Sequence, residues 1–278
     1  MSVLAQDRDS GIITYGDTTV RHDTQSDVAV EFLDFYRDND PDNTLKYLVF
    51  DSKFTTYKNL RKLEDSPHRI KFITVRKRGP KIIEDLKAIP KSDWTSMRVM
   101  AADGKGRKVQ VYEQTVWLKD YGKNIRQIAI TGTRRIQPAL IITNDFDLPI
   151  KEIIHKYARR WLVETEISEQ VHFFHLNRVC SSMVIKVDFD LTMSILAHNI
   201  YRLLAAELPG FSHQAAASLF DKFMDNGGKV IVDDERVTII LNKKRNVPVL
   251  LQAMDRFQDQ KIVSINNLKF RVVADSTS

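Results

Sequence analysis

The chain has 278 residues, of which 43% are hydrophobic and 28% are charged, and this usage is close to that of ordinary soluble domains. No apolar run approaches the roughly 18 residues that a membrane span needs, and residues 1–11 lack the basic and apolar regions of a signal peptide. The only cysteine, Cys180, excludes an intramolecular disulfide framework and a cysteine-based zinc site.

The formal net charge of +6 is unevenly distributed. Residues 1–50 hold four Lys/Arg and ten Asp/Glu, a net of −6, whereas residues 71–135 hold sixteen Lys/Arg and six Asp/Glu, a net of +10. An acidic segment followed by a basic one predicts a polyanionic partner that is met near carboxylates. The alternative is a lysine-rich, solvated surface.

The first third of the chain predicts strands that alternate with helices. "SVLAQ" is a strand that ends at Asp7, and "GIITYGDTTV" is a second strand. "SDVAVEFLDFYRDN" has helical spacing, with Ser26 as its cap. "KYLVFDS" predicts an apolar strand that ends at Asp51, "YKNLRKLED" predicts a helix, and "IKFITVRKRG" predicts a strand that leads to a basic tip.

The rest of the chain predicts strands between about 94 and 142, followed by long helices. "KVQVYEQTVWL", "IRQIAITG" and "RIQPALIIT" are strand-like and separated by turns. A helix then begins near Pro149, with Asp147 or Asn144 as its cap. A second long helix is capped by Asp188 or Asp190, and the tail predicts short strands around one helix. The order indicates a mixed α/β core with an insertion.

Asp7 and Asp51 each follow an apolar strand. If these strands are neighbours in one sheet, the two carboxylates meet at a common edge, where open sheets bind ligands. Two carboxylates repel each other and are stabilised by a divalent cation between them. A third carboxylate would complete a two-metal site. Asp9 and Asp17 are rivals to Asp7 for the first position.

The stretch "YARRWLVETE" offers the third carboxylate, Glu164. On one helix, Tyr157, Arg160 and Glu164 are spaced i, i+3 and i+7 and therefore share a face. This face combines a metal ligand with a guanidinium and a hydroxyl that can bind phosphate oxygens. The alternative is an ordinary ion pair between Arg160 and Glu164. Glu166 is a rival to Glu164, but it points about 200° away on the helix.

These segments resemble the catalytic domain of bacterial insertion-sequence DDE transposases. The resemblance rests on "FDSKFTTYKNLRKLED…IKFITVRKRG", "TNDFDLPIKEIIHKYARRWLVETE" and "VDFDLTMSILAHNIYRLLA", over residues 3 to 204. Tyr157, Arg160 and Glu164 match the Tyr-x2-Arg-x3-Glu part of the family signature. Asp51 and Asp7 match its second and first catalytic aspartates.

The resemblance implies an RNase H-like mixed sheet with flanking helices and a β-rich insertion between the second Asp and the Glu. It implies domains over 1–93 and 143–206 for the core, with the insertion at 94–142. A small α/β extension would cover 207–278. The implied activity is DNA transposition: cleavage at the transposon ends and transfer of the freed strand to target DNA. Asp7, Asp51 and Glu164 would bind two Mg²⁺ or Mn²⁺ ions.

The implied partners are double-stranded DNA and a second copy of the chain on that DNA, with no membrane, in the bacterial cytoplasm at the nucleoid. Tyr157, Arg160, Arg76, Lys77 and Arg78 would contact DNA. For the last three residues, the alternative is a solvated strand tip.

Two departures from the family pattern favour an alternative function. The signature lysine falls on Val171, for which Lys186 could substitute, and nothing precedes the first core strand. The chain could therefore be an N-terminally truncated transposase that only binds DNA.

Overall fold

The computed structural model describes residues 2–40, 42, 44–67, 69–100, 106–132, 138–176 and 183–275, with the side chains of residues 100 and 161–166 outside the description. The described chain divides into two compact units. The first unit comprises residues 1–3 and 17–166, and the second comprises residues 4–16 and 167–278.

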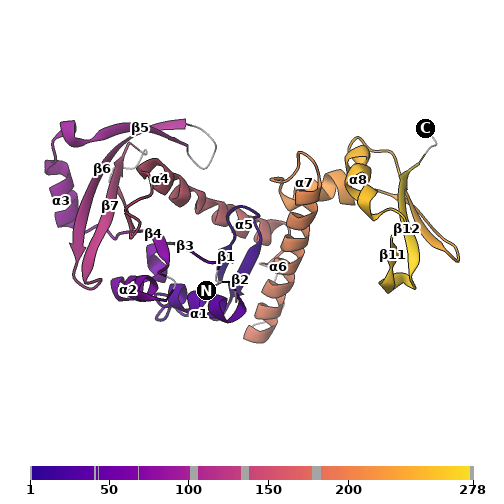
Figure 1. Cartoon of the computed structure of the whole chain (residues 1–278), viewed down its shortest axis with the longest axis horizontal. Helices are drawn as coiled ribbons and strands as arrows, with labels where there is room; N and C mark the ends of the chain where they lie inside the picture. Colours follow the sequence, from indigo (N-terminus) through magenta and orange to yellow (C-terminus); the bar gives the residue numbers. More distant parts are fainter. Residues whose placement is uncertain are drawn as a thin grey trace. The chain divides into compact units, whose positions relative to one another are not determined.

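The first unit is built on a mixed six-stranded sheet (Figure 1). In spatial order its strands are β3 (Tyr47–Val49), β4 (Lys71–Val75), β8 (Ala139–Thr143), β7 (Lys123–Thr131), β6 (Gly106–Leu118) and β5 (Thr95–Met100). β3 and β4 are parallel, with Leu48 opposite Phe72, and all other neighbours are antiparallel. The strand-rich segment therefore continues the sheet that β3 and β4 begin, because β8 pairs directly with β4.

Helices flank both faces of this sheet. They are α1 (Val28–Asn39), α2 (Tyr57–Asp65), α3 (Pro80–Ala88) and α4 (Ile150–Arg159), with the short turns η1 (Ser52–Phe54) and η2 (Lys91–Asp93). Phe72 and Ile142 pack with residues of α1 and α2 on one face, and Ile73 and Ile141 pack with Ile153 of α4 on the other. Alternate residues of a strand point to opposite faces, so the central strands are apolar on both faces.

Local sequence explains where these helices begin. Thr56 accepts a hydrogen bond from the backbone N–H of Asn59 and caps α2, as expected of a threonine in this position. Pro80 occupies the first turn of α3, where its missing N–H costs nothing. The predicted caps of two other helices are wrong: α1 begins after Asp27 instead of Ser26, and α4 begins after Pro149.

The second unit contains most of a hairpin, residues 4–16, which packs on a long helix. The hairpin consists of β1 (Val3–Gln6) and β2 (Ile13–Asp17), and the helix is α6 (Val184–Glu207). The Asn199 side chain accepts a hydrogen bond from the Ile13 N–H and donates one to the Ile13 carbonyl, each at 2.9 Å. α6 begins after Met183, so the predicted caps Asp188 and Asp190 lie inside the helix.

A buried histidine of α6 contacts both the hairpin and the preceding helix. His198 is fully buried, its Nε2 lies 3.1 Å from the Gly11 carbonyl, and its Nδ1 lies 3.2 Å from Oε2 of Glu169. Burial acts to raise the pKa of Glu169, but the hydrogen bonds from His198 and from the Ala216 N–H hold that pKa below its ordinary value. Glu169 lies on α5 (Trp161–His172).

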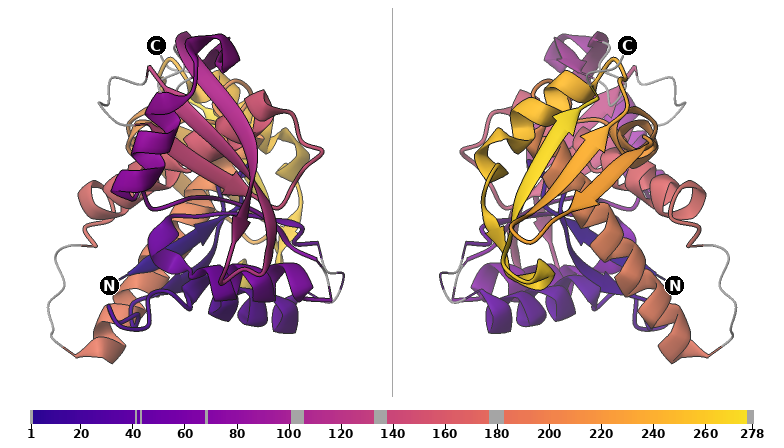
Figure 2. Two further views of the ribbon diagram at one scale, coloured as in Figure 1. Left: turned by 90° about the vertical axis from the view of Figure 1, so that its left-hand side faces the viewer. Right: turned by 90° about the vertical axis from the view of Figure 1, so that its right-hand side faces the viewer.

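The C-terminal part forms a four-stranded sheet with one packed helix (Figure 2, right). In spatial order the strands are β11 (Lys261–Ile262), β12 (Leu268–Ala274), β10 (Arg236–Leu241) and β9 (Gly228–Val232). The other elements are α7 (Ala216–Leu219), η3 (Phe220–Met224), α8 (Val247–Met254), η4 (Asp255–Phe257) and η5 (Val263–Ile265). Leu250 of α8 packs with Leu241 of β10.

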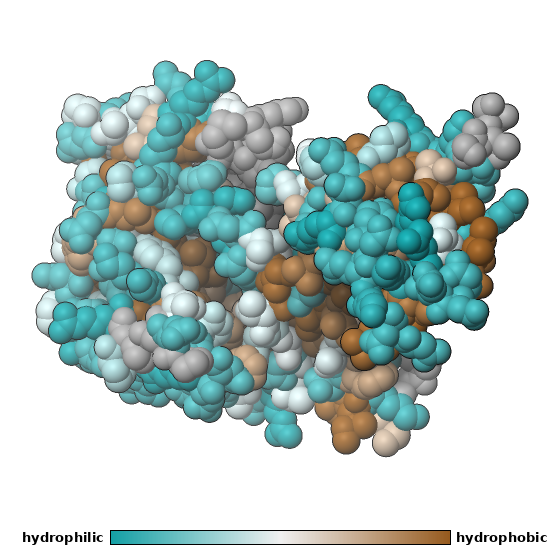
Figure 3. Space-filling view, turned by 45° about the vertical axis from the view of Figure 1, so that its right-hand side comes forward, coloured by the Kyte–Doolittle hydropathy of each residue, from teal (hydrophilic) through white to brown (hydrophobic). Residues whose placement is uncertain are grey.

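The predicted fold class is confirmed as a mixed α/β architecture with a mixed sheet and flanking helices. Among the described residues, none of the helices has the length and apolar character needed to cross a membrane. Hydrophobic residues lie among hydrophilic ones on the face that Figure 3 shows.

Candidate active site

Asp7 lies at the exposed tip of the β1–β2 hairpin. Its Oδ1 accepts hydrogen bonds from the Ser10 hydroxyl at 2.6 Å, the Ser10 N–H at 2.8 Å and the Asp9 N–H at 3.2 Å. The hydroxyl bond, followed by the backbone bond from Ser10, holds the pKa of the Asp7 carboxyl below its ordinary value. Asp7 is therefore ionised at neutral pH, as a metal ligand must be.

Asp51 is half-buried at the end of the segment that follows β3. Its Oδ1 accepts a hydrogen bond from the Lys53 N–H at 3.1 Å and one from the Ser52 hydroxyl at 3.4 Å, and it thereby caps η1. The carboxylate is thus fixed at the turn where the chain leaves the sheet, which is where the sequence predicts it.

Glu164 lies on α5, and its side chain is outside the described residues. The prediction of one continuous helix through Tyr157, Arg160 and Glu164 is wrong, because α4 ends at Arg159 and α5 begins at Trp161. At the junction, the Arg160 N–H donates to the Tyr157 carbonyl at 3.1 Å. A bond to the third preceding residue tightens the turn and alters the i, i+3, i+7 alignment expected of an unbroken helix.

Tyr157 and Arg160 are brought together by the structure. The Arg160 guanidinium carbon lies 5.4 Å from the centre of the Tyr157 ring, within range of a cation–π contact. Both side chains are half-buried, and Tyr157 also packs against the cluster that contains Ile73 and Ile153. Tyr157, one of the residues predicted to contact DNA, therefore also packs against the apolar core of the first unit.

The three basic residues predicted to contact DNA follow β4 and precede α3. Lys77 and Arg78 are exposed, and Arg78 donates to the Pro138 carbonyl at 3.3 Å. Arg76 is half-buried, and its guanidinium donates to the buried side chain of Gln127 at 2.6 Å. Arg76 thus has a structural contact that the sequence pattern did not indicate.

The rivals for the metal positions are also located. Asp17 at the end of β2 accepts bonds from the backbone and hydroxyl of Thr19, and Asp9 lies 4.0 Å from Arg8 on the exposed hairpin tip. The side chain of Glu166 is outside the described residues. Val171, which replaces the signature lysine, is half-buried, whereas Lys186 is exposed in the first turn of α6.

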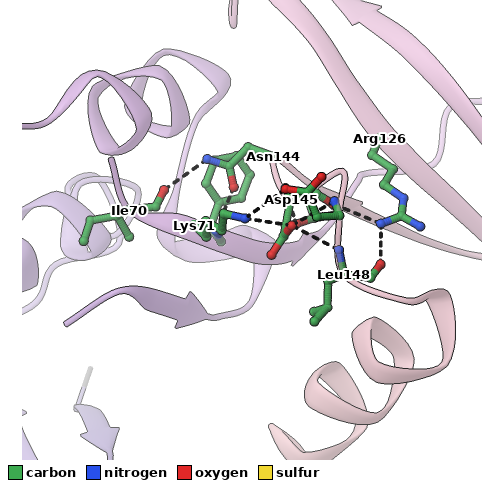
Figure 4. A network of polar contacts seen from close by, with 9 residues as sticks. Ile70, Lys71, Arg126, Asn144, Asp145 and Leu148 are labelled. Atoms are coloured by element: carbon green, nitrogen blue, oxygen red, sulfur yellow. Dashed lines mark hydrogen bonds and ion pairs between the residues drawn. The ribbon is translucent and has the colours of Figure 1, made fainter. Parts of the chain in front are cut away.

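A polar network that the sequence reasoning missed anchors the entry to α4 (Figure 4). Asp145 is buried and accepts hydrogen bonds from Lys71 at 2.9 Å and from the Asp147 and Leu148 N–H groups at 3.1 and 3.2 Å. Burial acts to raise the pKa of Asp145, but the bond from Lys71 and the backbone bonds hold it below its ordinary value.

Two further side chains complete the network. Asn144 accepts from the Phe72 N–H and donates to the Ile70 carbonyl, so its amide continues the pairing of β4 and β8 beyond the strand ends (Figure 4). Arg126 is buried on β7 and donates to the carbonyls of Asp145 and Leu148. The signal in the sequence is the motif "TNDFDLP", which by itself predicts only a helix cap at Asn144 or Asp147.

A half-buried tyrosine, Tyr47, lies near the network. Burial raises the pKa of Tyr47 on β3 to about 12, and the nearby Asp145 carboxylate adds to this effect. The Lys156 ammonium lies 5.1 Å from the centre of the same ring. β3, β8 and α4 are therefore joined by polar contacts as well as by apolar packing.

Within the described ranges, no three His, Cys, Asp or Glu side chains cluster closely enough to hold a metal ion. Among the described strands, β1 pairs only with β2, whereas β3 pairs with β4 in another sheet. The expectation that the strands before Asp7 and Asp51 are neighbours in one sheet is therefore wrong. Asp7 belongs to the second unit, and Asp51 and Glu164 belong to the first. The meeting of these three carboxylates therefore stays a prediction.

A comparison with models of protein families identifies the family of this chain. The family model described as "Transposase DDE domain" matches residues 3–200, a span that includes Asp7, Asp51 and Glu164. The chain therefore belongs to the DDE transposase family, as the sequence motifs predict. Among curated proteins no match to the chain is found. Members of this family act on DNA and generally use divalent metal ions.

Proposed function

We propose that this chain catalyses metal-dependent cleavage of DNA at the ends of an insertion sequence and transfer of the freed strand to target DNA. The family match over residues 3–200 carries this proposal. It is supported by the location of Asp7 at a hairpin tip and of Asp51 at a capped turn, because both carboxylates are held by main-chain bonds.

In this proposal, Asp7, Asp51 and Glu164 bind two Mg²⁺ or Mn²⁺ ions. Their carboxylate oxygens are the donors that these ions prefer, and the hydrogen bonds of Asp7 from Ser10 and Asp9 and of Asp51 from Ser52 and Lys53 end on Oδ1. Oδ2 of each aspartate would then face the metal. When bound, the ions would activate the attacking oxygen and stabilise the leaving oxygen.

The protein's own contribution is to bind and orient DNA. Arg160 would grip a phosphate through its guanidinium, and the Tyr157 hydroxyl would donate to another phosphate oxygen. The contact between these two side chains limits their freedom before DNA binds. Lys77 and Arg78 are exposed and would add non-specific contacts to the DNA backbone. The hydrogen bond from Arg76 to Gln127 would hold the start of this segment in place.

The organisation around this site is part of the same proposal. The core would comprise residues 1–93 and 143–206, with the insertion at 94–142 and an extension at 207–278. The strands β5 to β7 and the surplus of basic residues in this region support an insertion that contacts DNA. Transposon ends are paired by two copies of a transposase, so a homodimer on DNA at the bacterial nucleoid is proposed as well.

The test is strand transfer by the full chain from pre-cleaved transposon-end DNA in Mg²⁺ or Mn²⁺. Asp7→Asn, Asp51→Asn and Glu164→Gln should each reduce the rate by about a thousandfold or more, since a metal site is worth several kcal/mol. Asp9→Asn and Glu166→Gln are matched controls that change one carboxylate nearby, and they should stay within a fewfold of the unmodified chain.

DNA binding separates this proposal from the alternative of a chain that only binds DNA. The three variants should bind DNA as well as or better than the unmodified chain, because they remove negative charge beside phosphate. If the unmodified chain binds DNA in a salt-sensitive manner but transfers no strand in either metal, the alternative is correct and the proposed enzyme is wrong.

A further inference from the structure

The strand β9 is an apolar edge strand that is exposed along its whole length. All five of its residues are exposed, and the relative exposures of Val230, Ile231 and Val232 are 65%, 50% and 64%. β9 lies at the end of the four-stranded sheet, and β10 is its neighbour among the described strands (Figure 2, right). Folded proteins normally shorten, charge or cover such edges, because an open edge pairs with other strands.

The register of β9 shows which backbone groups point outward. The Asp233 N–H donates to the Arg236 carbonyl, and the Asn242 N–H donates to the Gly227 carbonyl. In an antiparallel ladder, hydrogen-bonded pairs alternate with non-hydrogen-bonded pairs. Residues 227, 229, 231 and 233 therefore bond to β10, and residues 228, 230 and 232 direct their N–H and C=O groups to the open edge.

The side chains of β9 are complementary to those of a second, antiparallel β9. If the two-fold axis passes through Ile231, Val230 lies opposite Val232 of the second copy, and Lys229 lies opposite Asp233. Val230 and Val232 both direct their N–H and C=O groups to the open edge, so this pair forms the backbone hydrogen bonds between the two copies. The Lys229–Asp233 positions are non-hydrogen-bonded pairs, whose side chains approach most closely.

On each face of the joined sheet, the side chains of the two β9 strands are also compatible with each other. Val230 and Val232 lie on the face of Val237 and Ile239, which are their partners on β10, and four valines would gather there. The opposite face would carry Ile231 against its own copy, flanked by two ion pairs. Asp233 keeps its turn, because the bonds from the Glu235 and Arg236 N–H groups both end on Oδ1.

We propose that β9 is a self-association site at which two copies of this chain pair antiparallel about Ile231 and form a continuous eight-stranded sheet. The symmetry is two-fold and closed, so the product is a dimer and not a fibre. Lys229 makes the edge selective, because a strand without a carboxylate in the matching position leaves its ammonium unpaired. The association needs no DNA and does not depend on transposase activity.

The first test is sedimentation of the full chain, without DNA, over micromolar to hundred-micromolar concentrations. A single pair of short strands belongs among interfaces below about 1,200 Å², so a reversible dimer of micromolar affinity is expected. Val230→Pro should weaken this dimer at least about tenfold, because proline removes an outward N–H and spares the bonds to β10. Val230→Thr keeps the N–H and the branched side chain, and it should dimerise normally.

The second test addresses charge and register. Lys229→Glu places two carboxylates opposite each other and should weaken the dimer, whereas Lys229→Arg should retain it. In a Cys180→Ser background, Ile231→Cys should form a disulfide-linked dimer on mild oxidation, because the two positions face each other. Val230→Cys should not, since its own copy lies two residues away in this register.

Several outcomes would overturn the proposal. A chain that stays monomeric over the whole concentration range has no such site. A dimer that is insensitive to Val230→Pro and is not cross-linked through Ile231→Cys uses another surface. Cross-linking through Val230→Cys instead of Ile231→Cys would show a different register. Unchanged thermal unfolding of Val230→Pro in the monomer is the control for folding.

Discussion

β7 and β9 are both rich in β-branched residues, yet their environments are opposite. Six consecutive residues of β7 are buried, and these include the polar Arg126 and Gln127. All residues of β9 are exposed, and these include three consecutive aliphatic residues. β7 is a central strand that is covered on both faces, whereas β9 is the last strand of its sheet. Position within the sheet, and not hydrophobicity, decides which residues are buried.

Both buried polar residues of β7 have hydrogen-bond partners, although the buried Nε2 of Gln127 has none among the described residues. Arg126 pairs with Glu113 and donates to two carbonyls, and Gln127 accepts from Arg76. A buried polar group costs free energy chiefly when its hydrogen bonds are lost. The first unit therefore holds its sheet with apolar and polar contacts together, while the C-terminal sheet leaves an apolar edge for another strand.

The largest expected effect is the difference in the free energy of unfolding between two isoleucine-to-alanine variants, one on each of these strands. Ile128→Ala on β7 should lower the free energy of unfolding by about 2–5 kcal/mol, because it leaves a cavity at a fully buried position. Ile231→Ala on β9 should change it by no more than about 0.5 kcal/mol in the monomer, as at other surface sites. Urea unfolding at low protein concentration measures both. Equal losses would show that β9 is covered within the monomer.

The next effect concerns the buried carboxylate of the first unit. Asp145→Asn should lower the free energy of unfolding by about 1–3 kcal/mol near pH 7, because it weakens bonds to a charged group. The folded-state pKa of Asp145 is below its ordinary value, so this stabilisation is complete above about pH 4 and is lost as the pH falls through the folded-state value.

The control for Asp145 is a carboxylate on the same turn. Asp147 is 95% exposed and lies 3.7 Å from the same Lys71 ammonium, so Asp147→Asn should change the free energy of unfolding by less than about 1 kcal/mol. The difference between the two variants should shrink when urea unfolding is repeated below pH 4. A difference that does not depend on pH would assign the effect of Asp145 to packing.

The smallest effect concerns two asparagines, one in each unit, whose side chains each bond to a backbone N–H and a backbone carbonyl. Asn144 bridges the backbone of Ile70 and Phe72, and Asn199 bridges both backbone groups of Ile13. Asn144→Ala and Asn199→Ala should each lower the free energy of unfolding by about 1–2 kcal/mol. Hydrogen exchange should then rise near β4 in the first variant and in the hairpin in the second. Faster exchange throughout the chain in either variant would show that the units do not respond separately.

Much of the fold could be predicted from local pattern. The helix predicted over "YKNLRKLED" is α2 itself, because its amphipathic spacing and its Thr56 cap are both local. The strands that end near Asp7 and Asp51 are also found. α3 is not among the predicted helices, although Pro80 after Gly79 is a recognisable helix start.

Other features depend on contacts between distant residues, which a single sequence does not show. The pairing of β8 with β4 joins residues about seventy positions apart, and the partners of Asp145 come from β4. The interruption at Arg160 is equally hidden, because "YARRWLVETE" contains no proline or glycine. The family motifs could be recognised directly in the sequence, whereas the strand pairing and hydrogen bonds that hold these motifs in place could not.

Metal binding tests the central claim most directly, because that claim is that Asp7, Asp51 and Glu164 hold divalent ions together. Calorimetric titration of the full chain with Mn²⁺ should show two ions per chain. Each single variant, Asp7→Asn, Asp51→Asn or Glu164→Gln, should lose or weaken this binding, while Glu166→Gln should bind as the unmodified chain does. Unchanged Mn²⁺ binding in any one of the three variants would contradict the account.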